Sequence, residues 1–187
     1  MDQPLKIVVS GPVGAGKTTL IRSLSVIDVI ETEEVSSEDI GKEMTTVAFD
    51  FGILSAEDTV VHLYGTPGQD RFDFMWEVLC EGALGMILLI PGDRPKDYPH
   101  ARRILEFVTS RIPVPFIVGV TRQDLGRVWE PEDVAAYFDL DLANVVAVNA
   151  TEHESALSAI TALLQAIEKE EQGGKGSLSA QSFTSAF

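Results

Sequence analysis

Four short runs of almost uninterrupted apolar residues constrain the fold more than any other feature of this 187-residue chain. They read LKIVVS (5–10), ALGMILLI (83–90), PFIVGV (115–120) and NVVAVN (144–149), and glycine, proline or polar residues bound each of them. Strands have this composition when helices cover both faces of a parallel sheet, because both sets of alternating side chains are then buried. The four runs therefore predict the central strands of an α/β domain.

Helical patterns lie between these runs, at residues 17–25, about 97–112, 131–138 and 152–169. In the last of them, leucine and isoleucine recur at the spacing that places them on one face of a helix. The third begins with Pro131, whose fixed φ suits the first turn of a helix. Strands that alternate with helices indicate a doubly wound fold with ligands at the carboxyl ends of the strands.

Two further apolar stretches, 45–54 and 58–65, are separated by the polar residues SAED and predict a β-hairpin. We therefore expect a three-layer α/β domain over residues 1–170. Its mostly parallel sheet should have six strands, one of them an antiparallel edge strand. Residues 171–187 are rich in Gly and Ser without periodicity, which predicts a flexible tail.

Charge and composition exclude several kinds of partner. The net charge of −15 argues against nucleic acid and against an anionic membrane surface. The single cysteine, Cys80, excludes an internal disulfide and favours a reducing compartment. The N-terminus lacks a signal-peptide pattern, no lipidation motif is present, and residues 83–90 are too few to span a bilayer. We expect a cytoplasmic protein with no stable membrane anchor.

The sequence GPVGAGKT (11–18) lies between the first apolar run and a predicted helix, and it matches the P-loop pattern G-x-x-x-x-G-K-[ST]. Its glycines let the backbone turn N–H groups toward phosphate oxygens, and the helix N-terminus adds a positive dipole. Lys17 is expected to bridge the outer phosphates, and the Thr18 hydroxyl to ligate Mg²⁺. The motif predicts a nucleoside triphosphate site formed by Val13, Gly14, Ala15, Gly16, Lys17, Thr18 and Thr19.

Together with this loop, three further stretches make residues 5–168 resemble a small Ras-like GTPase. The resemblance is closest to the bacterial branch that includes the MglA polarity GTPases and the GTPases encoded beside roadblock-type proteins. TTVAFDFG resembles the first switch, which implies that Thr46 ligates Mg²⁺. TPGQDRF resembles the second switch, which implies that Gly68 offers its N–H to the γ-phosphate and Gln69 orients the attacking water. The implied architecture is the P-loop GTPase fold.

The base-reading motifs of that family also have counterparts. TRQD (121–124) resembles the guanine-reading N-K-x-D motif, and NAT (149–151) resembles the S-A-K-like loop. A carboxylate at Asp124 can accept from guanine N1–H and the N2 amine together. We expect a threonine hydroxyl at 121 to brace the neighbouring loops less well than the family's asparagine amide. The resemblance implies a guanine site formed by Thr121, Arg122, Asp124, Asn149, Ala150 and Thr151.

Several residues depart from the family pattern. Gly65 stands where the family has an aspartate that reaches Mg²⁺ mainly through water, and Thr45 stands where MglA-like proteins carry an arginine. Val13 limits the room for a partner's arginine. Loss of such an outer carboxylate weakens a metal site without abolishing it, so we expect weaker Mg²⁺ binding and slow hydrolysis. Asp93, in IPGD, is expected to cap a loop rather than to replace the missing carboxylate.

The resemblance implies a GTP/GDP switch with slow hydrolysis, in which Gln69 and Lys17 are catalytic and a roadblock/longin-type protein is the regulator. The effector is not identified by the sequence. An alternative is a nucleotide-binding scaffold with little turnover; a P-loop kinase is less favoured because nothing resembles a lid or a second substrate site. Purely structural roles also stay open for three of these residues. Thr46 could be only a strand residue, Gln69 only a turn residue, and Asp124 only a helix or turn cap.

Overall fold

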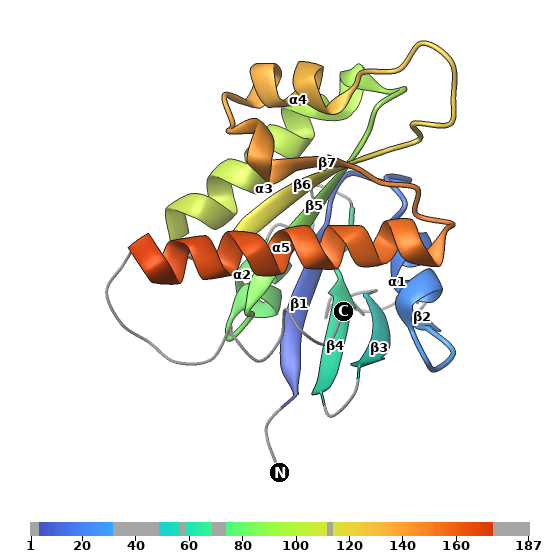
Figure 1. The fold of residues 1–187 in the computed structure, drawn as a ribbon, viewed down its shortest axis with the longest axis vertical. Helices are drawn as coiled ribbons and strands as arrows, with labels where there is room; N and C mark the ends of the chain where they lie inside the picture. Colours follow the sequence, from blue (N-terminus) through green and yellow to red (C-terminus); the bar gives the residue numbers. More distant parts are fainter. Residues whose placement is uncertain (1–3, 32–48, 57–58, 69–73, 112–113, 174–187) are drawn as a thin grey trace, which may run out of the picture.

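A computed structural model of the chain describes residues 4–31, 49–56, 59–68, 74–111 and 114–173. Helices cover both faces of a central sheet (Figure 1). Within the described residues the sheet has seven strands in the order β2-β3-β4-β1-β5-β6-β7. The predicted three-layer α/β fold is therefore confirmed, with one strand more than the six that were expected.

The sheet is mostly parallel, as predicted. Its central members pair in parallel, β1 with β4 and β5, and β6 with β5 and β7. The additional strand β2 pairs antiparallel with β3, which pairs antiparallel with β4, so β3 is not itself the edge. The strands are β1 (Leu5–Ser10), β2 (Ile30–Glu31), β3 (Asp50–Ala56), β4 (Thr59–Gly65), β5 (Gly85–Pro91), β6 (Phe116–Thr121) and β7 (Val145–Ala147).

The predicted hairpin is present as β3 and β4, which pair from Ala56 opposite Thr59 to Asp50 opposite Gly65. Residues 45–48, which were expected to belong to its first strand, lie outside the described residues. The register at the far end of the pair brings the first residue of β3 beside the last residue of β4. That end of the hairpin adjoins the loop of residues 11–16.

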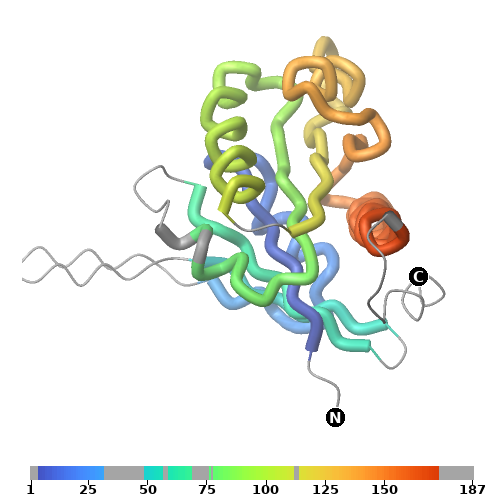
Figure 2. Tube along the Cα trace, turned by 90° about the vertical axis from the view of Figure 1, so that its left-hand side faces the viewer, coloured from blue at the N-terminus to red at the C-terminus, as the bar shows by residue number. Residues whose placement is uncertain are grey.

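The helices form two layers, one on each face of the sheet. In Figure 2 the helix of residues 98–111 (yellow-green) and the helix of residues 153–173 (red) lie on opposite sides of the strands. One hydrophobic core contains Ile7, Val9 and side chains of α1 and α5, and the other contains Val8 and side chains of α2, α3 and α4. Alternate residues of β1 thus enter opposite cores, which explains its continuous apolar sequence. The helices are α1 (Lys17–Leu24), α2 (Phe74–Cys80), α3 (Tyr98–Arg111), α4 (Pro131–Phe138) and α5 (His153–Gly173), with 3-10 turns η2 (Pro95–Asp97) and η3 (Leu142–Asn144).

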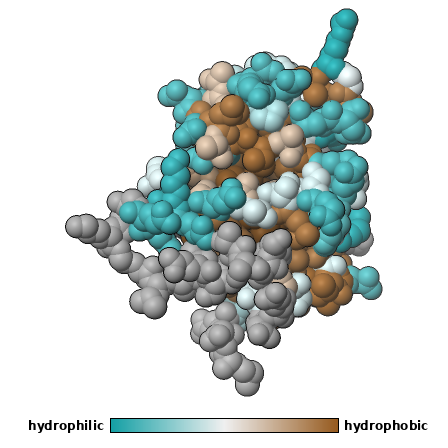
Figure 3. Space-filling view, in the orientation of Figure 1, coloured by the Kyte–Doolittle hydropathy of each residue, from teal (hydrophilic) through white to brown (hydrophobic). Residues whose placement is uncertain are grey.

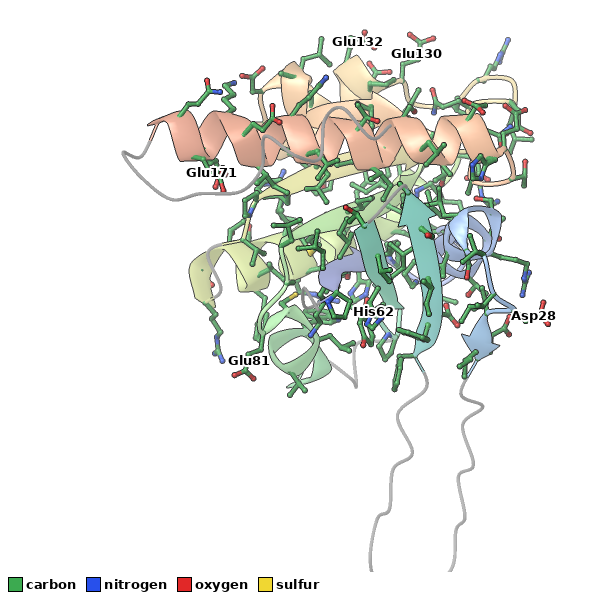
Figure 4. All side chains as sticks on the ribbon, turned by 60° about the horizontal axis from the view of Figure 1, so that its bottom comes forward. Asp28, His62, Glu81, Glu130, Glu132 and Glu171 are labelled. Atoms are coloured by element: carbon green, nitrogen blue, oxygen red, sulfur yellow. The ribbon has the colours of Figure 1, made fainter. Side chains whose placement is uncertain are left out.

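Helix α2 was not expected from the sequence, and α5 continues through Gly173, past the domain boundary expected at residue 170. Acidic side chains such as Glu130, Glu132 and Glu171 lie at the outer surface (Figure 4). Apolar residues reach the surface among hydrophilic ones on the face shown in Figure 3, as is usual for folded proteins. Among the described helices, none combines the length and the apolar character needed to cross a bilayer.

Candidate nucleotide-binding site

The loop of residues 11–16 joins β1 to α1, and two of its positions require glycine. Gly16 precedes the helix with φ of +103°, a left-handed conformation that a residue with a Cβ rarely adopts. At Gly11 a Cβ would lie 2.3 Å from the carbonyl oxygen of Leu89 on β5. The sheet and the helix therefore fix both ends of the loop, as the P-loop motif predicts.

Three donors hold three consecutive carbonyl oxygens of this loop. Arg94 Nη2 donates to Val13 O at 2.9 Å, and Arg122 Nη2 donates to Gly14 O at 3.0 Å. Thr121 Oγ1 donates to Ala15 O at 2.9 Å. The N–H of a trans peptide points opposite to its C=O. The N–H groups of the peptides after Val13 and Ala15 therefore point away from these donors.

The bond from Thr121 shows what the residue at this position holds, while the expectation that it braces the loops less well than an asparagine stays a prediction. A hydroxyl at this position does brace the loop, because Thr121 is buried at the end of β6 and its Oγ1 reaches Ala15 O directly. The Arg122 side chain is also held in place by two contacts. Its Nη1 lies 3.0 Å from Asp93 Oδ2, and its Nη2 donates to Gly14 O. Asp93 thus anchors an arginine. It does not replace the carboxylate that is missing at position 65.

Lys17 opens α1 and is 8% exposed. Its Nζ donates to the carbonyl oxygens of Gly11 and Pro12, each at 2.8 Å. Burial lowers the pKa of Lys17 from 10.5 to about 8; the negative charge of Asp50 raises it, and the positive charge of Arg94 lowers it further. An anion placed beside this ammonium group would offset the unfavourable burial of its charge.

Gly68 packs against the same ammonium group. A Cβ built on Gly68 would lie 2.7 Å from Val13 N and 2.8 Å from Lys17 Nζ. Both distances are shorter than a real Cβ tolerates, so the backbone of Gly68 packs closely on Val13 N and the Lys17 ammonium group. Any side chain at position 68 would collide with these two groups, so this contact requires glycine.

The structure reveals a carboxylate that the sequence analysis missed. Asp50 lies opposite Gly65 in the hairpin, and its Oδ2 accepts a 2.5 Å hydrogen bond from Thr18 Oγ1. A Cβ on Gly65 would lie 3.0 Å from that same carboxylate oxygen and 3.0 Å from Cδ1 of Ile21. Asp50 therefore occupies the space that a side chain on Gly65 would enter. The adjacent strand supplies a carboxylate where β4 lacks one.

The predicted base-reading residues lie around the same cavity as the loop. Asp124 and Leu125 follow β6 and line the cavity together with residues 149–151. Asn149 Oδ1 accepts from the N–H and the hydroxyl of Thr151, at 3.2 and 2.7 Å, which fixes the turn around Ala150. The cavity has a volume of about 510 Å³ and is lined by Gly14, Ala15, Gly16, Lys17, Thr18, Thr19, Thr121, Arg122, Asp124, Leu125, Asn149, Ala150 and Thr151.

Four predicted site residues are not part of this lining: Val13, Thr46, Gly68 and Gln69. Val13 contributes its backbone to the loop, while its side chain is 56% exposed. Thr46 and Gln69 lie outside the described residues, so the roles given to them stay predictions. Besides Asp50, the sequence analysis missed Arg94, whose position after β5 carried no motif, and Leu125, which follows the TRQD motif directly.

The fold and the phosphate-binding loop define a P-loop nucleotide-binding protein with the architecture of a small GTPase. The fold is similar to that of the Arl6 small GTPase from Trypanosoma brucei, solved with a bound nucleotide analogue. The two share a TM-score of 0.66 and 16% identity, over 90% of this chain and 100% of the other. The chain belongs to the family described as conserved hypothetical ATP binding protein, whose model matches residues 24–182.

One relative has a similar sequence over most of its length. It is an uncharacterized protein from Methanocaldococcus jannaschii, 32% identical over 124 residues, which are 66% of this chain and 73% of the relative. Nucleotide binding is thus supported by motif, cavity and family. The finer resemblance to MglA-like proteins stays a prediction.

The lowered pKa of Lys17 makes triphosphate binding dependent on pH. Above about pH 8 most of the Lys17 amine is neutral in the nucleotide-free protein, and binding takes up a proton because the phosphates favour the charged form. Affinity should therefore fall as pH rises from about 7 to about 9, with a slope approaching about tenfold per pH unit. Calorimetry in two buffers of different ionisation enthalpy measures the proton taken up.

Lys17→Met is the matched control, since it retains an apolar stem without the amine. Any dependence on pH that remains in this variant comes from groups other than Lys17, the nucleotide phosphates among them. If the wild-type protein and Lys17→Met have equal slopes, the affinity does not depend on the protonation of Lys17.

Proposed function

We propose that the protein binds GTP and GDP and acts as a GTP-operated switch with slow hydrolysis. The observation that carries the proposal is a single cavity with two kinds of wall. One wall is the phosphate-binding loop with Lys17 and Thr18, and the other contains Asp124 and the turn at 149–151. A nucleoside triphosphate has two parts that match these walls: an anionic end for the phosphate-binding loop, and a planar base with a polar edge for the wall with Asp124.

The choice of guanine rests on Asp124. A carboxylate accepts from guanine N1–H and the N2 amine as a charge-assisted pair, whereas adenine presents a lone pair at N1 and no amine. Adenine would leave the carboxylate facing an acceptor, which is unfavourable in an enclosed site. The description of the family names ATP, so the base is the property that an experiment must decide first.

Competition by ATP, GTP and XTP against one labelled nucleotide tests the base. GTP should compete better than ATP by as much as about 10⁴- to 10⁵-fold, because a mismatched polar edge is strongly rejected. Asp124→Asn should shift the preference toward XTP, whose C2 carbonyl suits an amide donor. Asp141→Asn makes the same chemical change at the exposed N-cap of η3 and should leave the order unchanged. ATP competing as well as GTP on the wild-type protein would overturn the guanine assignment.

The residues present also suit Mg²⁺. Thr18 and Asp50 place a hydroxyl and a carboxylate together beside Lys17, and Thr46 is the further hydroxyl that the resemblance implies. Oxygen ligands of this kind are those that Mg²⁺ prefers. When bound with nucleotide, the ion would neutralise charge on the phosphates. We assign the outer carboxylate of this site to Asp50, in place of the aspartate absent from position 65.

Asp50→Asn should therefore weaken Mg²⁺ binding in the nucleotide complex by about 10- to 100-fold, since the amide keeps the size but loses the charge. The measurement is a Mg²⁺ titration of the dissociation rate of a fluorescent triphosphate analogue. Asp141→Asn is again the matched control. If both variants have the same Mg²⁺ dependence as the wild-type protein, Asp50 is not part of the metal site.

Hydrolysis is proposed to be slow. Lys17 stabilises charge on the transferred phosphoryl group, and Gln69 orients the attacking water in the manner that the resemblance implies. Position 45 carries Thr and not an arginine, so a cationic group in cis is lacking at that position. A roadblock/longin-type protein is the proposed regulator and the cytoplasm the proposed location. Both rest on the sequence resemblance and composition.

Single-turnover hydrolysis by the wild-type protein should be near or below about 3–5 × 10⁻⁴ s⁻¹, the intrinsic rate of Ras. Gln69→Ala should reduce it further, while leaving the affinity for GDP unchanged. Equal rates for the two proteins would remove Gln69 from the reaction. Tight binding without measurable turnover, alone or with a candidate regulator, would support the scaffold interpretation instead.

A further inference from the structure

Arg94 contacts the phosphate-binding loop from outside the cavity. Its side chain is only 26% exposed, and it is not among the residues that line the cavity. Its Nη2 donates to Val13 O at 2.9 Å, and its Nε lies 3.3 Å from Asp97 Oδ2 in η2. One guanidinium group thus connects η2 to the loop.

The peptide that Arg94 holds has a donor on its other side. Val13 O and the N–H of Gly14 belong to one trans peptide, so they point in opposite directions. Gly14 lines the cavity. Within the part of the chain that the structure describes, the Gly14 N–H has no acceptor, whereas the Ala15 N–H is bonded to Pro12 O. Such a backbone N–H at the wall of an anion site is a donor for a phosphate oxygen.

The backbone of Gly14 also fits closely against the guanidinium group. Its φ is +71°, and a Cβ there would lie 3.2 Å from Arg94 Nη2 and 3.3 Å from Nη1. A side chain at position 14 would therefore press the guanidinium group away from Val13 O. Because the donors of a guanidinium group form a rigid planar fork, the contact of Nε with Asp97 also fixes the direction in which Nη2 donates.

We propose that Arg94 is a positioning residue for the phosphate groups of the bound nucleotide. Anchored by Asp97, it holds the Val13–Gly14 peptide so that the Gly14 N–H can donate to a phosphate oxygen without rearrangement. The inference rests on the proposed nucleotide-binding function and extends it to a residue that no motif assigns. Since the loop is ordered before the ligand arrives, loss of Arg94 makes binding less favourable.

The first test measures the affinities for GDP and a non-hydrolysable GTP analogue in competition against one labelled nucleotide. Arg94→Met keeps an apolar stem but removes the donor, and both affinities should fall by roughly 3- to 10-fold, about the contribution of one hydrogen bond. Arg111→Met makes the same change in net charge at the last residue of α3 and should leave both affinities unchanged. Equal losses in the two variants, or no loss in Arg94→Met, would overturn the proposal.

Asp97→Asn separates positioning from simple charge attraction, because the two predict opposite signs. If Arg94 acted only through its charge, neutralising the nearby carboxylate would strengthen the binding of an anion. Positioning instead predicts affinities about 2- to 3-fold weaker, since the guanidinium group loses its charged anchor. In the Arg94→Met background the same substitution should no longer weaken binding. Tighter binding in the single variant, or the same loss in both backgrounds, would contradict the proposed role.

The hydrogen bond to Val13 O has a direct spectroscopic readout. Val13–Gly14 and Val118–Gly119 are the two Val-Gly pairs in the sequence, so protein labelled with ¹³C′ on valine and ¹⁵N on glycine gives two signals in an HNCO spectrum. In Arg94→Met the Val13–Gly14 signal should move, while the signal from the pair in β6 should stay. A Val13–Gly14 signal at its wild-type position would mean that Arg94 does not hold this carbonyl.

Asp97→Asn, which keeps the size of the side chain, also decides the matter if Arg94→Met does not fold. Its nucleotide affinities and its Val13–Gly14 signal are then the two readouts, with the same expected directions. A wild-type protein that prefers adenine nucleotides refutes only the proposed base, and the series is repeated with ADP and an ATP analogue. A wild-type protein that binds neither kind refutes the proposed function and the inference with it. Nucleotide binding that is unchanged in every variant refutes the inference alone.

Discussion

The buried ammonium group of Lys17 is the interaction on which the rest of the site depends. A buried cation is unfavourable unless other groups compensate for its lost hydration. Here two carbonyl oxygens accept from it and Asp50 lies near enough to favour its charge, while Arg94 opposes it. This compensation is incomplete, as the lowered pKa of about 8 shows. The protein therefore holds a cation that an anion would stabilise, which is the physical basis of a phosphate site.

The loop is held by groups that differ in identity from those of the resembled motif. Thr121 and Arg122 stand where asparagine and lysine are expected, and each donates to a loop carbonyl. Arg94, from a different strand end, adds a third such bond at Val13 O. The three donors fix the peptide planes of the loop before any ligand is bound. Preorganisation of this kind reduces the ordering that binding requires.

Much of the fold could be predicted because burial on both faces leaves a direct signature, continuous apolar runs such as residues 5–10. The phosphate-binding loop could be predicted equally well from the sequence, since its glycines are required by local backbone geometry. The role of Asp50 could not be predicted, because it depends on the register of β3 against β4. A shift of one residue would turn its side chain to the other face of the sheet. The contact of His100 with Gly68 joins residues 32 apart through tertiary packing alone. The partner of the Thr121 hydroxyl, Ala15 O, likewise depends on tertiary structure.

Gly65 and Asp50 are best understood as one feature. The Asp50 carboxylate lies 3.0 Å from where a Cβ on Gly65 would begin, so the structure has room for a side chain from one strand or the other. An aspartate at position 65 would also place two carboxylates together, and one of them would then have to take up a proton or move. The missing side chain on β4 is therefore a condition for the bond between Asp50 and Thr18. In the sequence alone, Gly65 suggests a weakened metal site. In the folded protein, it leaves the carboxylate of Asp50 beside the hydroxyl of Thr18.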